Sequence, residues 1–208
     1  MRLTKFGHSC VRAEDDGVLV IDPGSLTEPA ALDGVDAVLI THEHADHLNV
    51  DALADLLGKR PSVTVYTHPE VATKLTALDG VVQTVTSGER FEAAGFRVRA
   101  YGGWHADIHP DIPRVVNLGY LLNDSVYHPG DSFDVPEGAQ VDTLFVPVSG
   151  PWLKLSDSVE FVRAVRPRRA YALHDGLLGD VGLQVYNSNL ARLVPCEYAR
   201  LEPGTVVD

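Results

Sequence analysis

The sequence predicts an α/β fold in which two β-sheets pack face to face and helices cover their outer faces, a four-layer α/β/β/α sandwich. Three observations lead to this prediction. Short apolar runs of strand length outnumber the segments with helical spacing. Strands and helices occur together in both halves of the chain, and polar residues collect where strands end. Periodicity by itself predicts only mixed α/β structure, so the sandwich rests on the excess of strands.

The first half of the chain begins with strands and continues with alternating strands and helices. Residues 35–41 (VDAVLIT) form a near-continuous apolar run, which is typical of a strand covered on both faces. Residues 49–59 place Val50, Leu53 and Leu57 at helical spacing, so a helix is expected to pack on that sheet. The other elements expected here are strands at residues 2–7, 9–13, 18–21 and 63–66 and a helix at residues 69–78.

The second half is expected to contain short strands, two helices and one long loop. The loop, residues 102–114, is rich in Gly, His, Asp and Pro, and a loop of this length inside a compact domain is usually functional. No low-complexity tract, linker or tandem repeat interrupts the chain, so residues 1–208 are expected to form a single domain. The expected strands are 82–85, 90–92, 96–101, 116–122, 125–128, 143–148, 169–173 and a short one near 198–201, and the expected helices are 157–165 and 181–193.

Composition limits the classes of partner. The chain has 208 residues and a formal net charge of −12, so nucleic acid is not an expected partner. Bound divalent cations would reverse the sign locally, and a small anionic substrate therefore stays open. Cys10 and Cys196 are far apart and are expected to be small buried residues in a reducing compartment. No apolar run approaches the ~20 residues that cross a bilayer, and the amino terminus lacks the apolar segment of a signal peptide, so a cytoplasmic protein without a membrane partner is expected.

The segment Thr41-His42-Glu43-His44-Ala45-Asp46-His47 carries the strongest chemical signal. It directly follows the apolar strand, so it is expected in a loop at the carboxyl end of that strand. His42 and His44 are two residues apart, which places both imidazoles on one side of an extended chain. That spacing lets one metal ion accept both nitrogens, while Asp46 and His47 can reach a second cation. The spacing differs from the helical HExxH of zinc proteases.

This segment resembles the HxHxDH motif of the metallo-β-lactamase superfamily. The other elements of that pattern follow in the expected order, at His105 in the mid-chain loop, Asp131 after a strand and His174 after a late strand. The resemblance spans residues 8 to about 176 and implies the metallo-β-lactamase fold. It further implies two metal positions, with Asp131 bridging them. One position would be held by His42, His44 and His105, and the other by Asp46, His47 and His174.

Two of these assignments have rivals nearby in the sequence. His109 lies four residues after His105, and His105 is preferred because it is nearer the end of the preceding strand and matches the family position better. His128 competes with Asp131, but a bridging ligand needs two acceptor atoms on one group and an imidazole does not supply them. Asp175, beside His174, is expected to cap or orient the following loop.

Other polar and aromatic residues near these motifs have open roles. Gly7-His8-Ser9 resembles the opening of the branch that includes ascorbate-6-phosphate lactonase-like proteins, which would place His8 near the metals; a hydrogen-bonded strand histidine is the alternative. The resemblance implies that Asp22 holds the histidine loop from behind rather than binding metal. His68 is expected to begin a helix. Trp104 and Trp152 either line a pocket or are simply buried.

The resemblance implies a metal-dependent hydrolase. Two divalent cations, zinc first with manganese or iron as alternatives, would share a hydroxide that attacks an ester, lactone or related bond of a small molecule. Asp46 would orient this nucleophile and pass a proton to the leaving group. Enzymes of this fold that cleave β-lactams usually lack the bridging Asp and are exported, so Asp131 argues against antibiotic hydrolysis. The oligomeric state is left open.

Three alternatives stay open at this stage. A phosphodiesterase or nuclease of the same fold would need a basic surface, yet residues 163–169 are the only basic cluster and are expected to be the solvated end of a helix. A non-hydrolytic dimetal protein, such as a diiron redox partner, would usually carry Glu at the position of His44. A binding module without metal is the third alternative.

Overall fold

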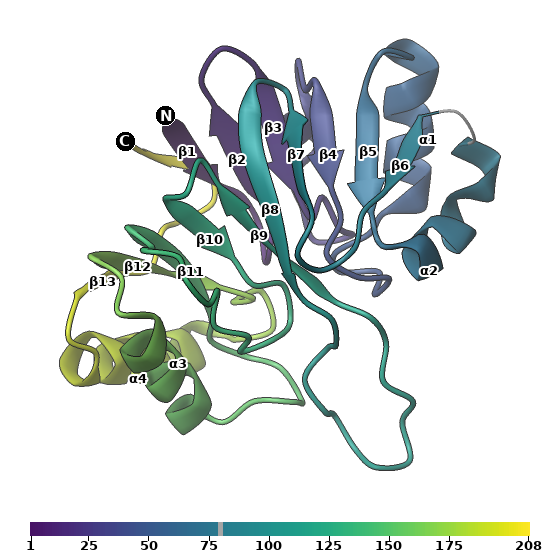
Figure 1. Ribbon diagram of the computed structural model, residues 1–208. Coiled ribbons are helices and arrows are strands. Elements are labelled where there is room, and N and C mark those ends of the chain that lie inside the picture. Colours follow the sequence, from purple (N-terminus) through teal and green to yellow (C-terminus); the bar gives the residue numbers. More distant parts are fainter. Residues whose placement is uncertain (79–80) are drawn as a thin grey trace.

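A computed structural model describes residues 1–78 and 81–208. It contains two seven-stranded sheets that face each other, with helices on the outer faces (Figure 1), so the predicted four-layer sandwich is confirmed. The first sheet has the order β14-β1-β2-β3-β4-β5-β6 and the second the order β13-β12-β11-β10-β9-β8-β7. The first sheet consists of β1 (Arg2–Lys5), β2 (Val11–Glu14), β3 (Val18–Ile21), β4 (Ala37–Leu39), β5 (Thr64–Thr67), β6 (Val82–Thr84) and β14 (Thr205–Val207). The second consists of β7 (Arg90–Ala93), β8 (Phe96–Gly102), β9 (Leu118–Leu122), β10 (Val126–His128), β11 (Thr143–Pro147), β12 (Arg169–Leu173) and β13 (Glu197–Ala199).

Both sheets are mixed, with an antiparallel part and a parallel part. In the first sheet β14, β1, β2 and β3 pair antiparallel, and β3 to β6 pair parallel. In the second sheet β7 to β10 pair antiparallel, and β10 to β13 pair parallel. Parallel strands end at the same edge of a sheet, so the loops that follow β4, β10 and β12 can meet where the two sheets come together.

Three apolar clusters fill the three interfaces of the sandwich. The central cluster packs one sheet on the other, through residues such as Leu39, Phe96 and Phe145. The other two pack each sheet against its helices. The helices are α1 (Val50–Lys59) and α2 (Pro69–Ala72) on the first sheet and α3 (Leu155–Val165) and α4 (Asp180–Leu193) on the second. Burial of both faces explains why the strand at residues 35–41 reads as a continuous apolar run.

The structure differs from the sequence predictions at a few elements. The helix expected over residues 69–78 is only the short α2, followed by a 3-10 segment, Thr73–Leu78, in which Leu75 departs from helical backbone angles. A second 3-10 turn, Pro29–Leu32, and the strand β14 were not predicted. A three-residue strand has too short an alternation to be seen in the sequence, and β14 exists because it pairs with β1 at the other end of the chain.

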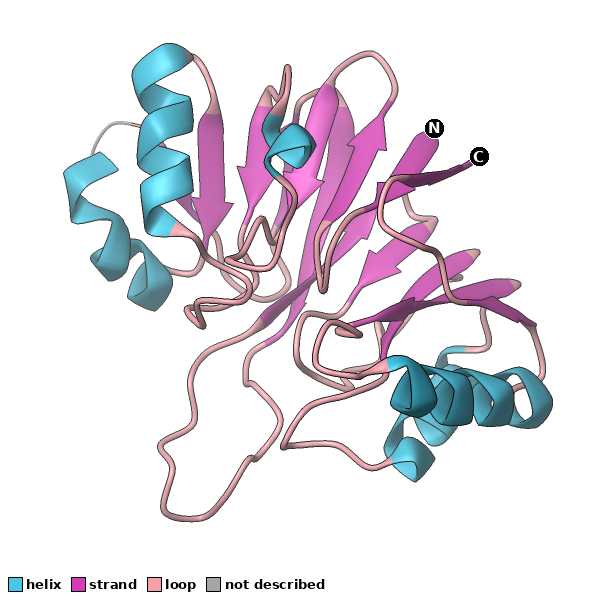
Figure 2. Cartoon of the chain, turned by 180° about the vertical axis from the view of Figure 1, so that it is seen from behind, coloured by secondary structure: helices cyan, strands magenta, loops and turns pink. Residues whose placement is uncertain are grey.

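The loop between β8 and β9, residues 103–117, leaves the sandwich as a long protrusion (Figure 2). It is slightly longer than the loop predicted from the sequence, because β9 begins at Leu118. Among the described helices, none combines the length and the apolar character that a membrane crossing requires.

Candidate metal centre

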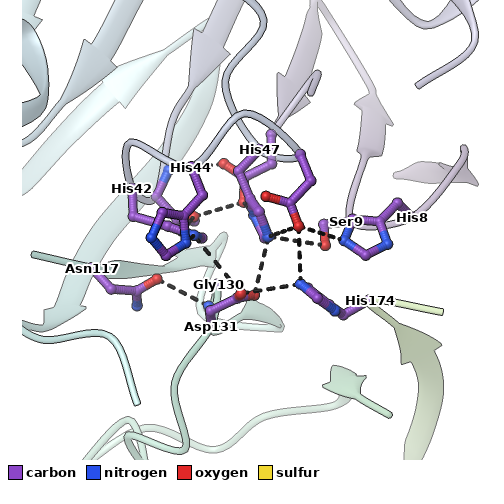
Figure 3. A network of polar contacts seen from close by, with 12 residues as sticks. His8, Ser9, His42, His44, His47, Asn117, Gly130, Asp131 and His174 are labelled. Carbon is purple, nitrogen blue, oxygen red and sulfur yellow. Dashed lines mark hydrogen bonds and ion pairs between the residues drawn. The ribbon is translucent and has the colours of Figure 1, made fainter. Parts of the chain in front are cut away.

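The predicted site residues come together at the edge where the two sheets meet (Figure 3). Each lies in a loop just after a strand, and the loops come from both sheets. His42, His44, Asp46 and His47 follow β4, His105 follows β8, Asp131 follows β10 and His174 follows β12. Every residue of the predicted set is thus brought into one cluster by the fold.

The cluster divides into two groups of four. Within each group the candidate ligand atoms all lie within 4.8 Å of one another. The first group is His42, His44, His105 and Asp131, and the second is His8, Asp46, His47 and His174. The grouping matches the two predicted positions and adds His8 to the second.

Asp131 lies between the two groups and contacts both. Its Oδ2 is 3.3 Å from His105 Nε2 and 3.1 Å from His174 Nε2. Its Oδ1 is 3.1 Å from His47 Nε2. The Asp131 side chain is almost fully buried. One carboxylate therefore faces imidazoles of both groups, which is the arrangement that a bridging ligand requires.

The His47 ring is held from behind by Asp22. His47 Nδ1 lies 2.7 Å from Asp22 Oδ2, and both side chains are fully buried. A carboxylate only accepts hydrogen bonds, so the Nδ1 of His47 carries the proton and donates it to Asp22. In the neutral ring, Nε2 is then a bare lone pair directed at Asp131.

Two further rings are fixed in the same way. His105 Nδ1 lies 2.6 Å from the Ala106 carbonyl oxygen, which can only accept, so His105 Nε2 is unprotonated in the neutral ring. Thr41 Oγ1 donates to Asp22 Oδ2 at 2.7 Å, so it accepts from His42 Nδ1 at 3.0 Å. His42 Nε2 is thereby left bare, 3.1 Å from His44 Nδ1.

These lone pairs face carboxylate oxygens in a buried site, and this arrangement is suited to binding cations. In the described part of the chain, His105 Nε2, Asp131 Oδ1 and His174 Nε2 are buried and make no hydrogen bond. Buried polar atoms without partners are costly, and a lone pair against an anion is repulsive. Imidazole nitrogen and carboxylate oxygen are donors suited to zinc, manganese or iron, and a cation between them would satisfy both.

The charges of the cluster shift pKa values in opposite directions. Burial opposes ionisation of Asp131, but the neighbouring His47 and His174 outweigh it and hold the Asp131 pKa well below its usual range. Burial also opposes protonation of His47, but the carboxylates of Asp131 and Asp22 raise the His47 pKa well above its usual range. Both shifts have the same cause, the close approach of imidazoles and carboxylates in a buried cluster.

Close backbone approaches hold the ligand loops. A Cβ on Gly24 would lie 1.8 Å from the carbonyl oxygen of Asp46, so only glycine lets the two loops touch. Gly130 has φ +63°, and a Cβ there would lie 2.3 Å from Asn117 Oδ1. Asn117 accepts from the Asp131 N–H at 3.0 Å and donates to the Pro129 carbonyl at 2.8 Å. Asn117 was not singled out in the sequence, where only a polar residue in an apolar strand marks it.

The competing residues lie outside the cluster. His109 is exposed and faces Asp111 on the protruding loop. His128 is buried, but Nε2 donates to the Ser9 carbonyl at 2.8 Å and Nδ1 accepts from the Gly130 N–H at 3.2 Å, so both ring nitrogens are used. His68 caps α2 by accepting from the Glu70 N–H.

The two tryptophans have different surroundings. Trp152 is buried against two of the candidate ligands, with ring centroids 5.5 Å from His105 and 5.7 Å from His174. Trp104 is 51% exposed on the protruding loop, where the Arg114 guanidinium lies over its ring. Arg114 also donates to the His105 carbonyl oxygen. Trp152 thus forms a wall of the cluster, and Trp104 lies near its entrance.

The chain is similar to known proteins over most of its length. Residues 2–174 match the family model described as beta-lactamase superfamily domain. The chain is 37% identical to Protein Rv0786c of Mycobacterium tuberculosis over 214 residues, which cover 100% of this chain and 99% of that protein. A UPF0173 metal-dependent hydrolase of Methanocaldococcus jannaschii is 31% identical over 137 residues, 62% of this chain and 60% of that protein. The structure of Igni18, a metallo hydrolase of Ignicoccus hospitalis, has a TM-score of 0.76 at 21% identity and covers 99% of this chain and 97% of its own. This last likeness concerns the fold.

Proposed function

We propose that this chain, which belongs to the metallo-β-lactamase superfamily and is a metal-dependent hydrolase, binds two divalent cations at the two groups that meet at Asp131 and hydrolyses an ester, lactone or related small-molecule bond. The observation that carries the proposal is the Asp131 carboxylate, which faces imidazole Nε2 atoms of both groups. His42, His44 and His105 would hold one cation, and Asp46, His47 and His174 the other.

The cations and the side chains would make different contributions to hydrolysis. Two divalent cations, when bound, lower the pKa of water toward neutrality and stabilise negative charge that develops on a substrate oxygen. The chain fixes the orientation of the imidazoles through Asp22, Thr41 and the Ala106 carbonyl. His42, His47, His105, Asp131 and His174 are buried, which shields these side chains from bulk water.

Asp46 is placed for proton transfer. Its side chain is 29% exposed, whereas Asp131 and the imidazoles of His42, His47, His105 and His174 are buried. Its contacts with His8 and His174 both use Oδ2. The Asp46 carboxylate would orient the attacking water, accept a proton from it and pass that proton to the leaving group.

Apolar side chains of the protruding loop lie near His44 and His105. Beside His44 and His105, a depression is lined by Ile108, Ile112 and Arg114 of the protruding loop. The chain's net charge of −12 disfavours a polyanion such as nucleic acid. A membership in the lactonase-like branch, which the Gly7-His8-Ser9 opening resembles, stays a prediction.

Metal analysis followed by a substrate panel tests this proposal. Protein purified without added metal should contain about two metal ions per chain, zinc before manganese or iron. It should hydrolyse members of a panel of lactones and thioesters and be inactivated by a chelator. Protein that binds no metal, even after reconstitution, would refute the proposal. Turnover of only bis-p-nitrophenyl phosphate would favour the phosphodiesterase reading, and two irons without hydrolysis would favour a redox protein.

A further inference from the structure

His8 belongs to the second group, although its position as a ligand was not predicted. It lies in the loop between β1 and β2, its side chain is fully buried, and its backbone has φ +57°. Non-glycine residues adopt this left-handed conformation at a cost of order 1 kcal/mol, and such residues cluster at functional sites. His174, in the loop after β12 of the other sheet, has φ +58°.

The proton of the neutral His8 ring is on the nitrogen that faces the cluster. The Gly176 N–H donates to His8 Nδ1 at 3.1 Å, so Nδ1 is the acceptor and Nε2 carries the hydrogen. His8 Nε2 lies 3.0 Å from Asp46 Oδ2 and therefore donates to it (Figure 3). This is the reverse of His42, His47 and His105, which turn a bare Nε2 toward the site.

His8 also touches the ligand that comes from the opposite sheet. The His174 N–H donates to the His8 carbonyl oxygen at 3.1 Å, and the two rings lie with centroids 3.9 Å apart. A Cβ on Gly176 would lie 3.0 Å from His8 Nδ1, so the loop after β12 closes directly on the His8 ring. One side chain thus spans Asp46 of the first sheet and His174 of the second.

We propose that His8 is a positioning residue for the second cation, which acts by donating its Nε2–H to Asp46 Oδ2 and by fixing the spacing between Asp46 and His174. It would not bind the cation itself, because the nitrogen that it presents is a donor. This inference rests on the proposed function, since it concerns one of the two cation positions. It extends the predicted site by a residue that touches two ligands from different sheets.

Two amide variants separate donation from coordination. His8→Gln keeps an N–H donor at the distance of Nε2, whereas His8→Asn has the same amide but is too short to reach Asp46. Asparagine is also among the residues that tolerate positive φ best, so the shorter variant carries no added backbone strain. Metal-free wild type and both variants would be titrated with zinc and with cobalt, following stoichiometry, stepwise affinity and the visible spectrum of the cobalt forms. Thermal unfolding reports whether each variant is folded.

We expect His8→Asn to bind the second cation 10- to 100-fold more weakly, as is typical for loss of a group that orients a ligand, with the first affinity unchanged. His8→Gln should stay within about 3-fold of wild type for both cations. A folded His8→Gln that loses the second cation would overturn the inference in favour of direct coordination, whether or not His8→Asn folds. Unchanged binding by His8→Asn would overturn it as well. A wild type that takes up only one cation refutes the two-cation proposal itself, and that result is distinct from both of these.

Discussion

The imidazoles of His42, His47 and His105 are each held by an acceptor that lies outside the cluster. Asp22 serves two of the rings, since it accepts from His47 Nδ1 and from the Thr41 hydroxyl that in turn accepts from His42. Its other oxygen accepts from the Thr41 N–H at 2.8 Å. A single buried carboxylate therefore determines which ring nitrogens of the histidine loop are free to bind metal.

Replacing Asp22 tests this role at the residue scale. In Asp22→Asn an amide N–H₂ faces the Thr41 donors or His47 Nδ1, so one of these groups loses its acceptor or His47 changes tautomer. We expect metal affinity and turnover to fall about 10- to 100-fold. Competition with a chromophoric chelator measures the affinity. Asp36→Asn, at an exposed carboxylate paired with Arg60, is the matched control and should bind metal normally. Equal affinities in the two variants would contradict the role.

Replacing Asp131 should lower turnover more than replacing a residue, such as Asp22, that only orients a ligand. Asp131→Ala removes the carboxylate that faces both groups, and we expect turnover to fall by more than about 100-fold with loss of at least one metal ion, while the far-ultraviolet circular dichroism stays that of a folded protein. His68→Ala serves as the control, because His68 only caps α2 and should change turnover by less than about 2-fold. Full activity of Asp131→Ala would show that the bridging assignment is wrong.

At the scale of elements, β1 and the loop after β12 are joined by a buried ion pair. Lys5 Nζ lies 3.4 Å from Asp175 Oδ1, with side-chain exposures of 1% and 5%. Arg200, which directly follows β13, donates to the other Asp175 oxygen at 2.7 Å. Burial lowers the Lys5 pKa, and the Asp175 carboxylate opposes that shift. Since Asp175 follows His174 directly, this pair ties a candidate ligand to the opposite sheet.

Removing one partner of this ion pair should lower the free energy of unfolding more than removing both partners. Asp175→Asn leaves the Lys5 ammonium buried without its counter-charge, and we expect the free energy of unfolding to fall by about 3–5 kcal/mol. In Lys5→Met/Asp175→Asn the buried ammonium is removed as well, and Arg200 keeps its contact with Glu202, so part of that loss should be recovered. Urea unfolding of both variants and of Lys5→Met completes the cycle. Purely additive effects would show that the two charges do not interact.

At the scale of the molecule, the cluster lies where the two sheets meet, so cations would join the halves of the sandwich. In the metal-free protein the His47 pKa is raised above its usual 6.5 by Asp131 and Asp22, although burial opposes the shift. A raised pKa in the folded state contributes stability that is complete below the unfolded value and is lost as pH rises through the folded value. A cation must displace the same proton, so its affinity rises with pH over that range.

Metal-loaded and metal-free protein should therefore differ in their response to pH. As the pH rises above about 6.5 we expect the thermal midpoint of chelator-treated protein to fall, while the stabilisation by added zinc increases. Differential scanning calorimetry with and without chelator measures this gap, which is the difference between the thermal midpoints of metal-loaded and metal-free protein. A gap that is constant across this range would mean that no proton on the cluster competes with metal.

Most of the fold could be predicted from the sequence, because burial produces local patterns of apolar residues. The continuous apolar run before Thr41 and the helical spacing in residues 49–59 predicted a covered strand and its packed helix, as found in β4 and α1. The prediction of one helix over residues 69–78 was wrong, because a helix can end within a segment whose composition favours helix. The strand β14 was missed because it is stabilised by pairing with β1, almost the whole chain away.

The candidate site, too, could be predicted only in part from the sequence. The sequence by itself determined the residue types that can bind metal and their place after strand ends, from the HxHxDH loop to His174, because ligand chemistry and strand length are local properties. Only the tertiary structure decided that Asn117 holds the turn of Asp131, and that His8 donates to Asp46. Those facts depend on distances between loops of different sheets and on which ring nitrogen carries a proton. Both are set by neighbours far away in the sequence, so no local pattern could reveal them.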